Sequence, residues 1–390
     1  MNMITVTLQY GDNYVDVEFP CSDNYLQSRL NELHYEGNFL QHAFVHEVIE
    51  PKELSVLEKT FVSPDELNYL AKRMDSFWGD EEIQFYEAAK HRGCATPKDL
   101  INMTFNLQKY TLIRDISNLG KVGQEYLLNT QGSIPAHDDD NPKYAAIARE
   151  LLSSGKGIVT DSGLLFDNPE LEFDEVYDGH VFPPYYYDNS MLSTIRADYG
   201  GRSEYLYLPC ESISIQKALM RLGASEIKDV DFSVEDCMFE SQEWNDRIED
   251  MLTNDGIRKL NTFLDIVSAE GFDYDKMDAV IEYAGVSDGT SLINLAKNMD
   301  KFTFVSEAES YYDVGAYLCK INNDFFLPPH LNSFFDYAKY GQQMSDKQSG
   351  EFTSQGFVSL VGNVTLPDIL PDKEPTMKPD KEPTMKLGGM

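Results

Sequence analysis

Residues 285–289, Gly-Val-Ser-Asp-Gly, have the G-x-S-x-G spacing of hydrolases, in which the nucleophilic serine stands between a strand and a helix. The preceding residues 277–284 are expected to form a helix instead of a strand. Gly285 suits the end of that helix, and an N-cap follows it, just as Thr96 and Pro97 suit a cap and first turn earlier in the chain. A catalytic Ser287 is therefore not expected.

Two other short motifs begin like ligand-binding loops but lack essential residues. Around Lys156, the first glycine position of a phosphate-binding loop is Glu150, and glycine replaces the Ser or Thr that binds Mg²⁺. The run that starts at Asp273 begins like a calcium loop, but Asp278 stands where that loop needs glycine for its sharp turn. We therefore expect no bound cofactor.

Histidines offer two candidate metal positions. His42 and His46 are four residues apart, and His137 precedes three aspartates. The first pair falls where the second half of the chain predicts a strand, and no H-E-x-x-H motif completes it. The five cysteines are odd in number and never spaced C-x-x-C, which argues against a zinc ribbon and a disulfide framework. No metal site is expected, and no catalytic residues are assigned.

The composition is strongly acidic. The 390 residues include 66 acidic and 32 basic side chains, which gives a net charge of −34, and 42% are hydrophobic. This is too apolar for a disordered chain, so the carboxylates must cover folded domains. Such a surface repels nucleic acids and anionic lipids and attracts basic partners. Without a signal peptide or a spanning apolar segment, the chain is expected in the cytoplasm.

The sequence repeats itself. Tyr10-Gly11 recurs as Tyr199-Gly200 after 189 residues, and Leu-Ile-Asn at 100–102 recurs at 292–294 after 192 residues. The matches keep their order, so we predict two tandem modules. The tail contains Pro-Asp-Lys-Glu-Pro-Thr-Met-Lys twice and is expected to be disordered. The predicted segments are module 1 at 1–168, an acidic connecting segment at 169–191, module 2 at 192–366 and the low-complexity tail at 367–390.

Hydrophobic patterning gives both modules the same order of elements. Each has a small αβ unit, a helical cluster and a second small αβ unit, so the predicted fold class is α+β, in an elongated multi-domain chain. A hairpin is expected at residues 4–19 and is repeated around Gly200-Gly201, and a third is expected at 158–166. The expected helices include 26–33, 67–77, 260–267 and 145–151, and residues 230–234 alternate as a strand.

The carboxylates themselves are the remaining functional signal. Two stretches combine many acidic residues with few basic ones, Lys228 and Arg247 being the basic residues of the second stretch. Neighbouring carboxylates repel and lower the stability of the fold, so this density of negative charge favours a function in binding a basic partner. Duplex DNA carries one negative charge per roughly 1.7 Å, and a folded acidic surface can occupy a groove built for DNA. The candidate DNA-mimic residues are Glu170, Glu172, Asp174, Glu175, Asp178, Glu226, Asp229, Asp231, Glu235, Asp236, Glu240, Glu243, Asp246, Glu249 and Asp250.

Several runs in the second module together resemble a known family. They are Ile-Glu-Tyr-Ala-Gly at 281–285, Leu-Ile-Asn-Leu at 292–295, Leu-Pro-Pro-His-Leu at 327–331, Phe-Asp-Tyr-Ala-Lys-Tyr-Gly at 335–341 and Gly-Glu-Phe-Thr-Ser-Gln-Gly-Phe-Val at 350–358. This pattern resembles the ArdA antirestriction proteins over most of residues 192–361. The first module resembles them more weakly, since it has Lys143 and Ala148 where the second has Asp336 and Gly341.

The resemblance implies three small domains per module, no enzymatic activity and a DNA mimic that blocks type I restriction-modification enzymes, on phages and other mobile genetic elements. Its partner would be the basic DNA-binding groove of such an enzyme. ArdA proteins usually have one module and dimerise, so this tandem chain would be either a covalent pseudo-dimer or a homodimer. Two alternatives stay open: a mimic that inhibits another defence nuclease such as a CRISPR effector, and an acidic scaffold for a basic mobile-element protein.

Overall fold

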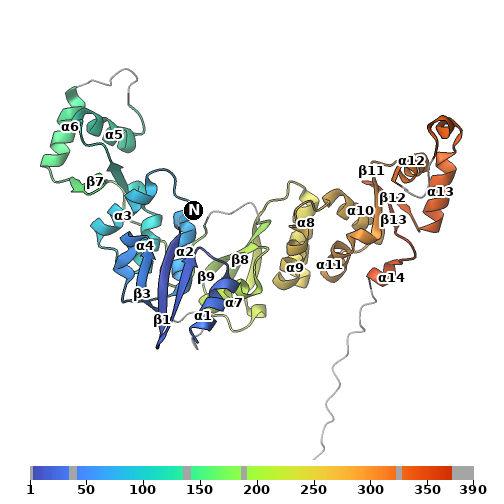
Figure 1. Ribbon diagram of the computed structural model, residues 1–390, viewed down its shortest axis with the longest axis horizontal. Coiled ribbons are helices and arrows are strands. Elements are labelled where there is room, and N and C mark those ends of the chain that lie inside the picture. Colours follow the sequence, from blue (N-terminus) through green and yellow to red (C-terminus); the bar gives the residue numbers. More distant parts are fainter. Residues whose placement is uncertain (1–2, 35–41, 135–141, 186–190, 322–326, 371–390) are drawn as a thin grey trace, which may run out of the picture. The chain divides into compact units, whose positions relative to one another are not determined.

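The computed structural model describes residues 3–34, 42–134, 142–185, 191–321 and 327–370. Helices and small antiparallel sheets alternate along the chain, so the fold is mixed α+β, as the sequence predicts (Figure 1). The chain divides into two compact units, residues 1–237 and 238–390. The boundary therefore falls inside the predicted second module and not between the two modules. Each unit is described by itself below.

The first unit begins with a four-stranded antiparallel sheet of order β2-β1-β3-β4. Its strands are β1 (Ile4–Tyr10), β2 (Asn13–Phe19), β3 (Ala43–Glu50) and β4 (Phe61–Val62). Alternate residues of β1 and β2 are buried, because successive side chains of a strand point to opposite faces. The turn between them contains Gly11 with a positive φ. Helix α1 (Asp23–Glu32) buries Leu26 and Leu30, so the predicted hairpin and helix are confirmed.

Three helices follow in the first unit: α2 (Pro64–Asp75), α3 (Glu81–Arg92) and α4 (Pro97–Thr104). The apolar stripe predicted for residues 67–77 is confirmed over α2, where Leu67, Leu70 and Met74 are fully buried. At the start of α4, Thr96 and Asp99 form a capping box, which is the cap that the sequence predicts.

Short 3₁₀ turns occur in both units, namely η1 (Lys52–Leu57), η2 (Leu107–Lys109), η3 (Ile227–Asp229), η4 (Met299–Lys301) and η5 (Pro329–Phe334).

A second small αβ element completes the first predicted module. It consists of β5 (Tyr110–Ile113), α5 (Leu119–Gln131), α6 (Pro142–Ser153), β6 (Gly157–Thr160) and β7 (Gly163–Asp167), with sheet order β5-β7-β6. The hairpin predicted at 158–166 and the helix predicted at 145–151 are therefore confirmed. Ile113, Val122, Ala148 and Phe166 form the core of this element.

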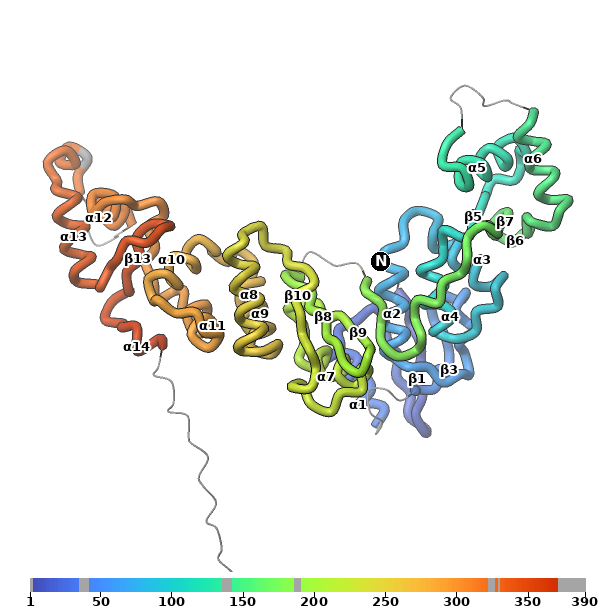
Figure 2. Tube along the Cα trace, turned by 180° about the vertical axis from the view of Figure 1, so that it is seen from behind, coloured from blue at the N-terminus to red at the C-terminus, as the bar shows by residue number. Residues whose placement is uncertain are grey.

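The first unit also contains the beginning of the predicted second module. This part comprises β8 (Ser193–Tyr199), β9 (Arg202–Leu208), α7 (Ser212–Leu222) and β10 (Asp231–Cys237), with sheet order β10-β8-β9. The second predicted hairpin and the strand at 230–234 are confirmed. Helix α7 lies beside α1, its counterpart in the first module (Figure 2).

The second unit starts with four helices and continues with a three-stranded sheet of order β11-β13-β12. The helices are α8 (Gln242–Asp255), α9 (Ile257–Val267), α10 (Tyr274–Ala284) and α11 (Gly289–Lys297). The remaining elements are β11 (Phe302–Ser306), α12 (Tyr311–Ile321), α13 (Tyr337–Lys347), β12 (Glu351–Thr353), β13 (Gly356–Leu360) and α14 (Leu366–Ile369). The stripe predicted at 260–267 is buried on α9, as expected.

Helix α14 differs from the expectation of a disordered tail from residue 367. Thr365 and Asp368 form a capping box that starts this short helix, and Ile369 is buried. Residues 371–390, which carry the eight-residue repeat, lie outside the described residues.

Helices α12 and α13 approach so closely that their backbones touch. A Cβ atom added at Gly315 would lie 1.9 Å from the Tyr337 carbonyl oxygen, and one added at Gly341 would lie 2.0 Å from the Tyr311 carbonyl oxygen. In the corresponding α5–α6 pair of the first module, Ala148 stands at the position of Gly341. A Cβ atom added at Gly123, the counterpart of Gly315, would lie 2.0 Å from the Tyr144 carbonyl oxygen. The two modules therefore share one close approach of this helix pair and differ at Ala148 and Gly341.

Candidate functional site

Over its described residues 169–185, the acidic connecting segment runs along the surface of the first unit without helix or strand. Its predicted acidic residues Glu170, Glu172, Asp174, Glu175 and Asp178 are all exposed. The aromatic residues between and after them pack inward: Phe173, Phe182 and Tyr185 are partly buried against the core, and Tyr177 is buried within it. Because the apolar side chains hold the segment down, the carboxylates face solvent from a fixed backbone.

Two buried asparagines hold this segment in register. Asn106 donates to the Asp174 carbonyl oxygen at 2.9 Å and accepts from the Asp174 N–H at 2.8 Å. Asn102, on α4, makes the same pair of bonds with Tyr177, at 2.9 and 2.8 Å. Buried amides require such partners, and backbone groups of the segment supply them. The predicted connecting segment is thus an integral part of the first unit.

Five more predicted residues belong to the end of the first unit. Glu226 and Asp229 lie at η3, and Asp231, Glu235 and Asp236 lie on β10, an edge strand of its sheet. All five are exposed. Along β10, Phe232 and Val234 are half-buried between the exposed carboxylates, so the strand presents a charged face to solvent. Charged edges are also a common protection against unwanted strand pairing.

The last five predicted residues lie in the second unit, and all are exposed. Glu240 precedes α8, which carries the other four, Glu243, Asp246, Glu249 and Asp250. The opposite face of α8 buries Trp244, Ile248, Met251 and Leu252. A helix with this pattern keeps one face in the core and presents the other to solvent, so the acidic face of α8 has a defined direction.

Basic side chains neutralise part of these surfaces. Lys228 pairs with Glu226 at 2.7 Å, and Lys98 pairs with Glu175 at 3.8 Å. On α8, Arg247 binds Glu243 at 3.0 Å and also Asp278 at 2.9 Å. Glu226, Glu175 and Glu243 therefore contribute less to the outward field than a count of carboxylates suggests. Asp246, Glu249 and Asp250 are the remaining acidic residues of the exposed α8 face.

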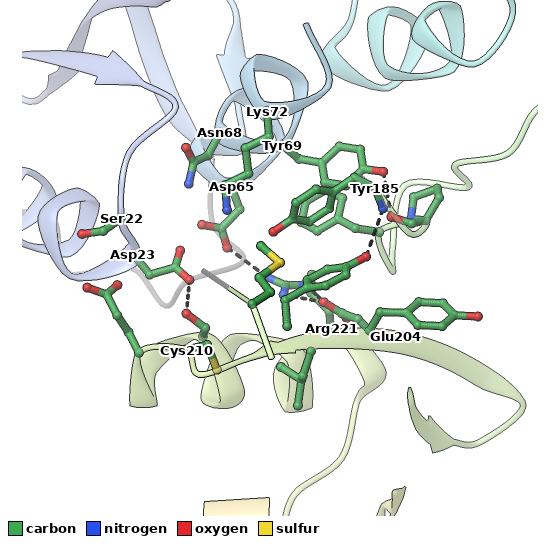
Figure 3. Close-up of a pocket in the computed structure, with 18 of the residues that line it drawn as sticks. Ser22, Asp23, Asp65, Asn68, Tyr69, Lys72, Tyr185, Glu204, Cys210 and Arg221 are labelled. Carbon is green, nitrogen blue, oxygen red and sulfur yellow. Dashed lines mark hydrogen bonds and ion pairs between the residues drawn. The ribbon is translucent and has the colours of Figure 1, made fainter. Parts of the chain in front are cut away.

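A buried charge cluster in the first unit was not anticipated from the sequence. Lys217 on α7 contacts Asp23 at 2.9 Å and Asp65 at 2.6 Å, and its side chain is only 3% exposed. Arg221, one turn later, binds Asp65 at 3.3 Å and also pairs with Glu204. Figure 3 shows Asp23 and Asp65 from the first module opposite Arg221 and Glu204 from the second. These ion pairs join the two predicted modules inside one unit.

Beside this cluster is a cavity of about 370 Å³ whose walls include Tyr69, Tyr185 and Glu204. Among the described residues, the Glu204 Oε2 atom is buried and has no hydrogen-bond partner. Burial raises the pKa of Glu204, and Arg221 opposes that shift only in part. For Asp23, burial acts in the same direction, but the Lys217 ion pair and a hydrogen bond from Ser214 outweigh it and lower its pKa.

Cysteine and histidine positions give no reactive centre within the described residues. All five cysteines are free thiols, and burial raises the pKa of Cys210, next to the charge cluster, to about 12. At neutral pH that thiol stays protonated. His46 lies in β3, as the repeat predicts, and no group of three potential metal ligands occurs in the described part of the chain. His137 and the aspartates after it lie outside the described residues.

The G-x-S-x-G spacing is explained by helix ends. Gly285 ends α10 in the left-handed conformation, and Asp288 caps α11 by accepting a hydrogen bond from the Ser291 N–H. The predicted helix before Gly285 is confirmed, and the strand that a nucleophilic serine requires does not precede it. Likewise, Asp273 serves as the N-cap of α10.

In the part of the chain that the structure describes, no helix has both the length and the apolar character needed to cross a membrane. The chain matches none of the protein-family models and none of the curated proteins with which it was compared. The functional argument therefore depends on the residues and their geometry.

Proposed function

We propose that this protein is a DNA mimic that occupies the DNA-binding groove of a type I restriction-modification enzyme. The observation that carries the proposal is that all fifteen predicted carboxylates are exposed, and that packed aromatic residues, strand pairing or a buried helix face hold the backbone of twelve of them. A mimic needs this combination, because charges on a flexible chain would lose conformational entropy on binding. The resemblance to ArdA proteins supplies the target.

The charge density on α8 is of the right order for such a mimic. From Glu243 to Asp250 the helix carries four carboxylates over about 10 Å, given a rise of about 1.5 Å per residue. Both strands of duplex DNA carry about six phosphates over the same length. Arg247 offsets one of the four charges, so the local density is about half that of DNA. Further acidic residues in both units add to the total of −34.

We expect the full chain to inhibit DNA binding and cleavage by a purified type I restriction-modification enzyme, and to inhibit less as salt rises. Ion pairing and counterion release drive such binding, so an increase from 50 to 200 mM salt should weaken it by about 10³-fold or more if six or more charges are engaged. The measurement is a titration of cleavage and of DNA binding at both salt concentrations. Absence of inhibition at both concentrations contradicts the proposed target.

Neutralising the exposed face of α8 should weaken the inhibitor without unfolding it. Asp246→Asn, Glu249→Gln and Asp250→Asn together remove three charges that point away from the core. We expect at least about a 10-fold higher concentration for half-inhibition, since each lost contact weakens binding, and unchanged or higher thermal stability because like-charge repulsion is relieved.

The matched control carries Asp265→Asn, Glu270→Gln and Asp275→Asn, three exposed acidic positions elsewhere in the same unit. It has the same net charge as the α8 variant. If both variants lose inhibition equally, net charge alone acts and α8 has no particular role. If the protein inhibits only a different defence nuclease, the proposal of DNA mimicry stands and the proposed target is wrong.

A further inference from the structure

Trp78 is the most exposed large hydrophobic side chain of the described residues, at 86%. It lies between α2 and α3, directly after Phe77, which is partly buried and packs against Phe85. The other tryptophan, Trp244, is 2% exposed. Tryptophan has the largest apolar surface of the side chains and is usually well buried. An indole left in solvent therefore needs an explanation other than core packing.

The turn that carries Trp78 is fixed. The Trp78 N–H donates to the Glu81 carboxylate at 2.8 Å, and the Trp78 carbonyl oxygen accepts from the Glu81 N–H at 3.1 Å. Gly79 follows with a φ of +60°, a conformation that glycine adopts without strain. The ring thus projects from a clamped backbone, which limits the entropy that a partner must remove on binding.

The surroundings of Trp78 are strongly acidic. From Asp75 to Glu87 the chain has five carboxylates and no basic residue. Asp75, Asp80 and Glu81 are exposed. Asp80 is paired with Arg114 at 2.8 Å, and the Glu81 carboxylate accepts the hydrogen bond from the Trp78 N–H. The quadrupole of an aromatic ring attracts a cation to the ring face, and neighbouring carboxylates attract the same cation by their charge.

The chain's own ring contacts indicate which cation fits. Both arginines and lysines lie over rings, and the arginines lie closer. The arginine contacts are Arg92 over Phe173 at 3.5 Å, Arg73 over Phe105 at 4.1 Å, Arg247 over Trp244 at 4.7 Å and Arg221 over Phe182 at 4.9 Å, whereas Lys143 lies 5.1 Å from the Tyr144 ring and Lys72 lies 5.4 Å from the Tyr185 ring. A planar guanidinium stacks on a ring while its N–H groups reach carboxylates, which a lysine ammonium does less well. Within the described residues, no cation or ring partner covers the indole of Trp78.

We infer that Trp78 and its neighbouring carboxylates bind an arginine side chain of the basic partner. The inference rests on the proposed function for the nature of the partner and adds a residue that makes contact through its ring. Tryptophan is among the residues that most often dominate binding energy at protein interfaces. None of the residues of this site is among the fifteen acidic residues predicted from the sequence. The site also differs from them in its expected preference for arginine over lysine.

The test uses the full chain with decaarginine and decalysine as probes of equal charge. Trp78 fluorescence should respond to decaarginine, with at least about fivefold tighter binding than to decalysine. The Trp78→Phe variant supplies the reference signal, since its remaining indole is Trp244. Trp78→Ala should lose the preference for arginine and keep a residual, salt-sensitive affinity for both peptides. Equal affinities for the two peptides in the wild type, or an unchanged preference in Trp78→Ala, overturn the inference.

An inhibition assay separates this inference from the proposed function. Trp78→Ala should raise the concentration for half-inhibition of the restriction enzyme about 10-fold or more, as expected for loss of an interface anchor. The matched control is Phe334→Ala, which removes a ring that is 84% exposed in a stretch, residues 325–335, without acidic residues. If the wild type and Trp78→Ala inhibit equally, the role of Trp78 is refuted while the proposed function stands. If the wild type does not inhibit, the target is refuted and the peptide titrations still decide the role of Trp78.

Discussion

Replacing Lys217 by methionine is expected to lower the free energy of unfolding of residues 1–237 by about 3 to 5 kcal/mol. Lys217 is the cation between Asp23 and Asp65, and its side chain is almost fully buried. Methionine fits the space of the aliphatic stem but leaves the carboxylates without that partner. An uncompensated buried charge costs much more than an exposed ion pair contributes.

Amide hydrogen exchange of the full chain measures this effect locally. Protected amides of α1 and α7 should exchange about 100-fold faster or more in Lys217→Met, since tenfold corresponds to about 1.4 kcal/mol. Adding Asp23→Asn should recover part of the loss, because it removes one of the orphaned charges. The control is Lys228→Met, whose pair with Glu226 is exposed on both sides. If the two single variants exchange alike, the cluster does not stabilise the unit as described.

Replacing Gly341 by alanine is expected to separate α12 from α13 and to destabilise this part of the second unit by about 3 kcal/mol. The new Cβ would lie 2.0 Å from the Tyr311 carbonyl oxygen and 2.8 Å from the Gly315 nitrogen. Both are backbone atoms, which cannot turn aside as a side chain does. The helices must therefore move apart, and Val314 and Leu318 lose their packing.

Whether Gly341→Ala raises or lowers stability tests the close approach of α12 and α13. In an open helix, glycine to alanine stabilises by about 1 kcal/mol, because alanine has the higher helix propensity. Hydrogen exchange in α12 and α13 should therefore accelerate by about 100-fold if the close approach dominates. It should slow if propensity dominates, and that outcome would refute the packing described. Gln343→Ala, at an exposed position of the same helix, is the control and should change little.

The local elements of this fold follow from the sequence because local patterns determine them. Alternating residues from Ile4 to Phe19 give a hairpin, and Gly285 ends a helix, as both patterns predict. Helix α14 is not predicted from the sequence although Thr365 and Asp368 have capping-box spacing, because the repetitive polar tract after Pro367 lacks apolar periodicity and favours disorder. The boundary at residue 237 depends on packing between distant segments, which periodicity does not report.

For the candidate site too, some features could be predicted from the sequence and others could not. Exposure of the acidic residues follows from their charge, so each predicted position is exposed. Their neutralisation by Lys228 and Arg247 depends on side-chain geometry that spacing alone does not give. The buried charge cluster joins residues up to 194 positions apart, and nothing local distinguishes Lys217 from a surface lysine. For the connecting segment, the sequence does contain a usable signal: acidic and aromatic residues alternate in 170–185, which predicts a segment packed along a surface.

The charge cluster also limits which residues the two predicted modules could exchange. Asp23 and Asp65 belong to the first copy and Lys217 and Arg221 to the second, and the positions 189 residues before these cations are Ser28 and Glu32. The copies have thus divided the charged partners between them, and neither holds a full set. Gene conversion that overwrote the second copy with the first would place serine and glutamate where buried cations are needed, leaving the carboxylates unpaired. The two predicted modules are therefore not interchangeable at these positions, because each supplies charges that the other lacks.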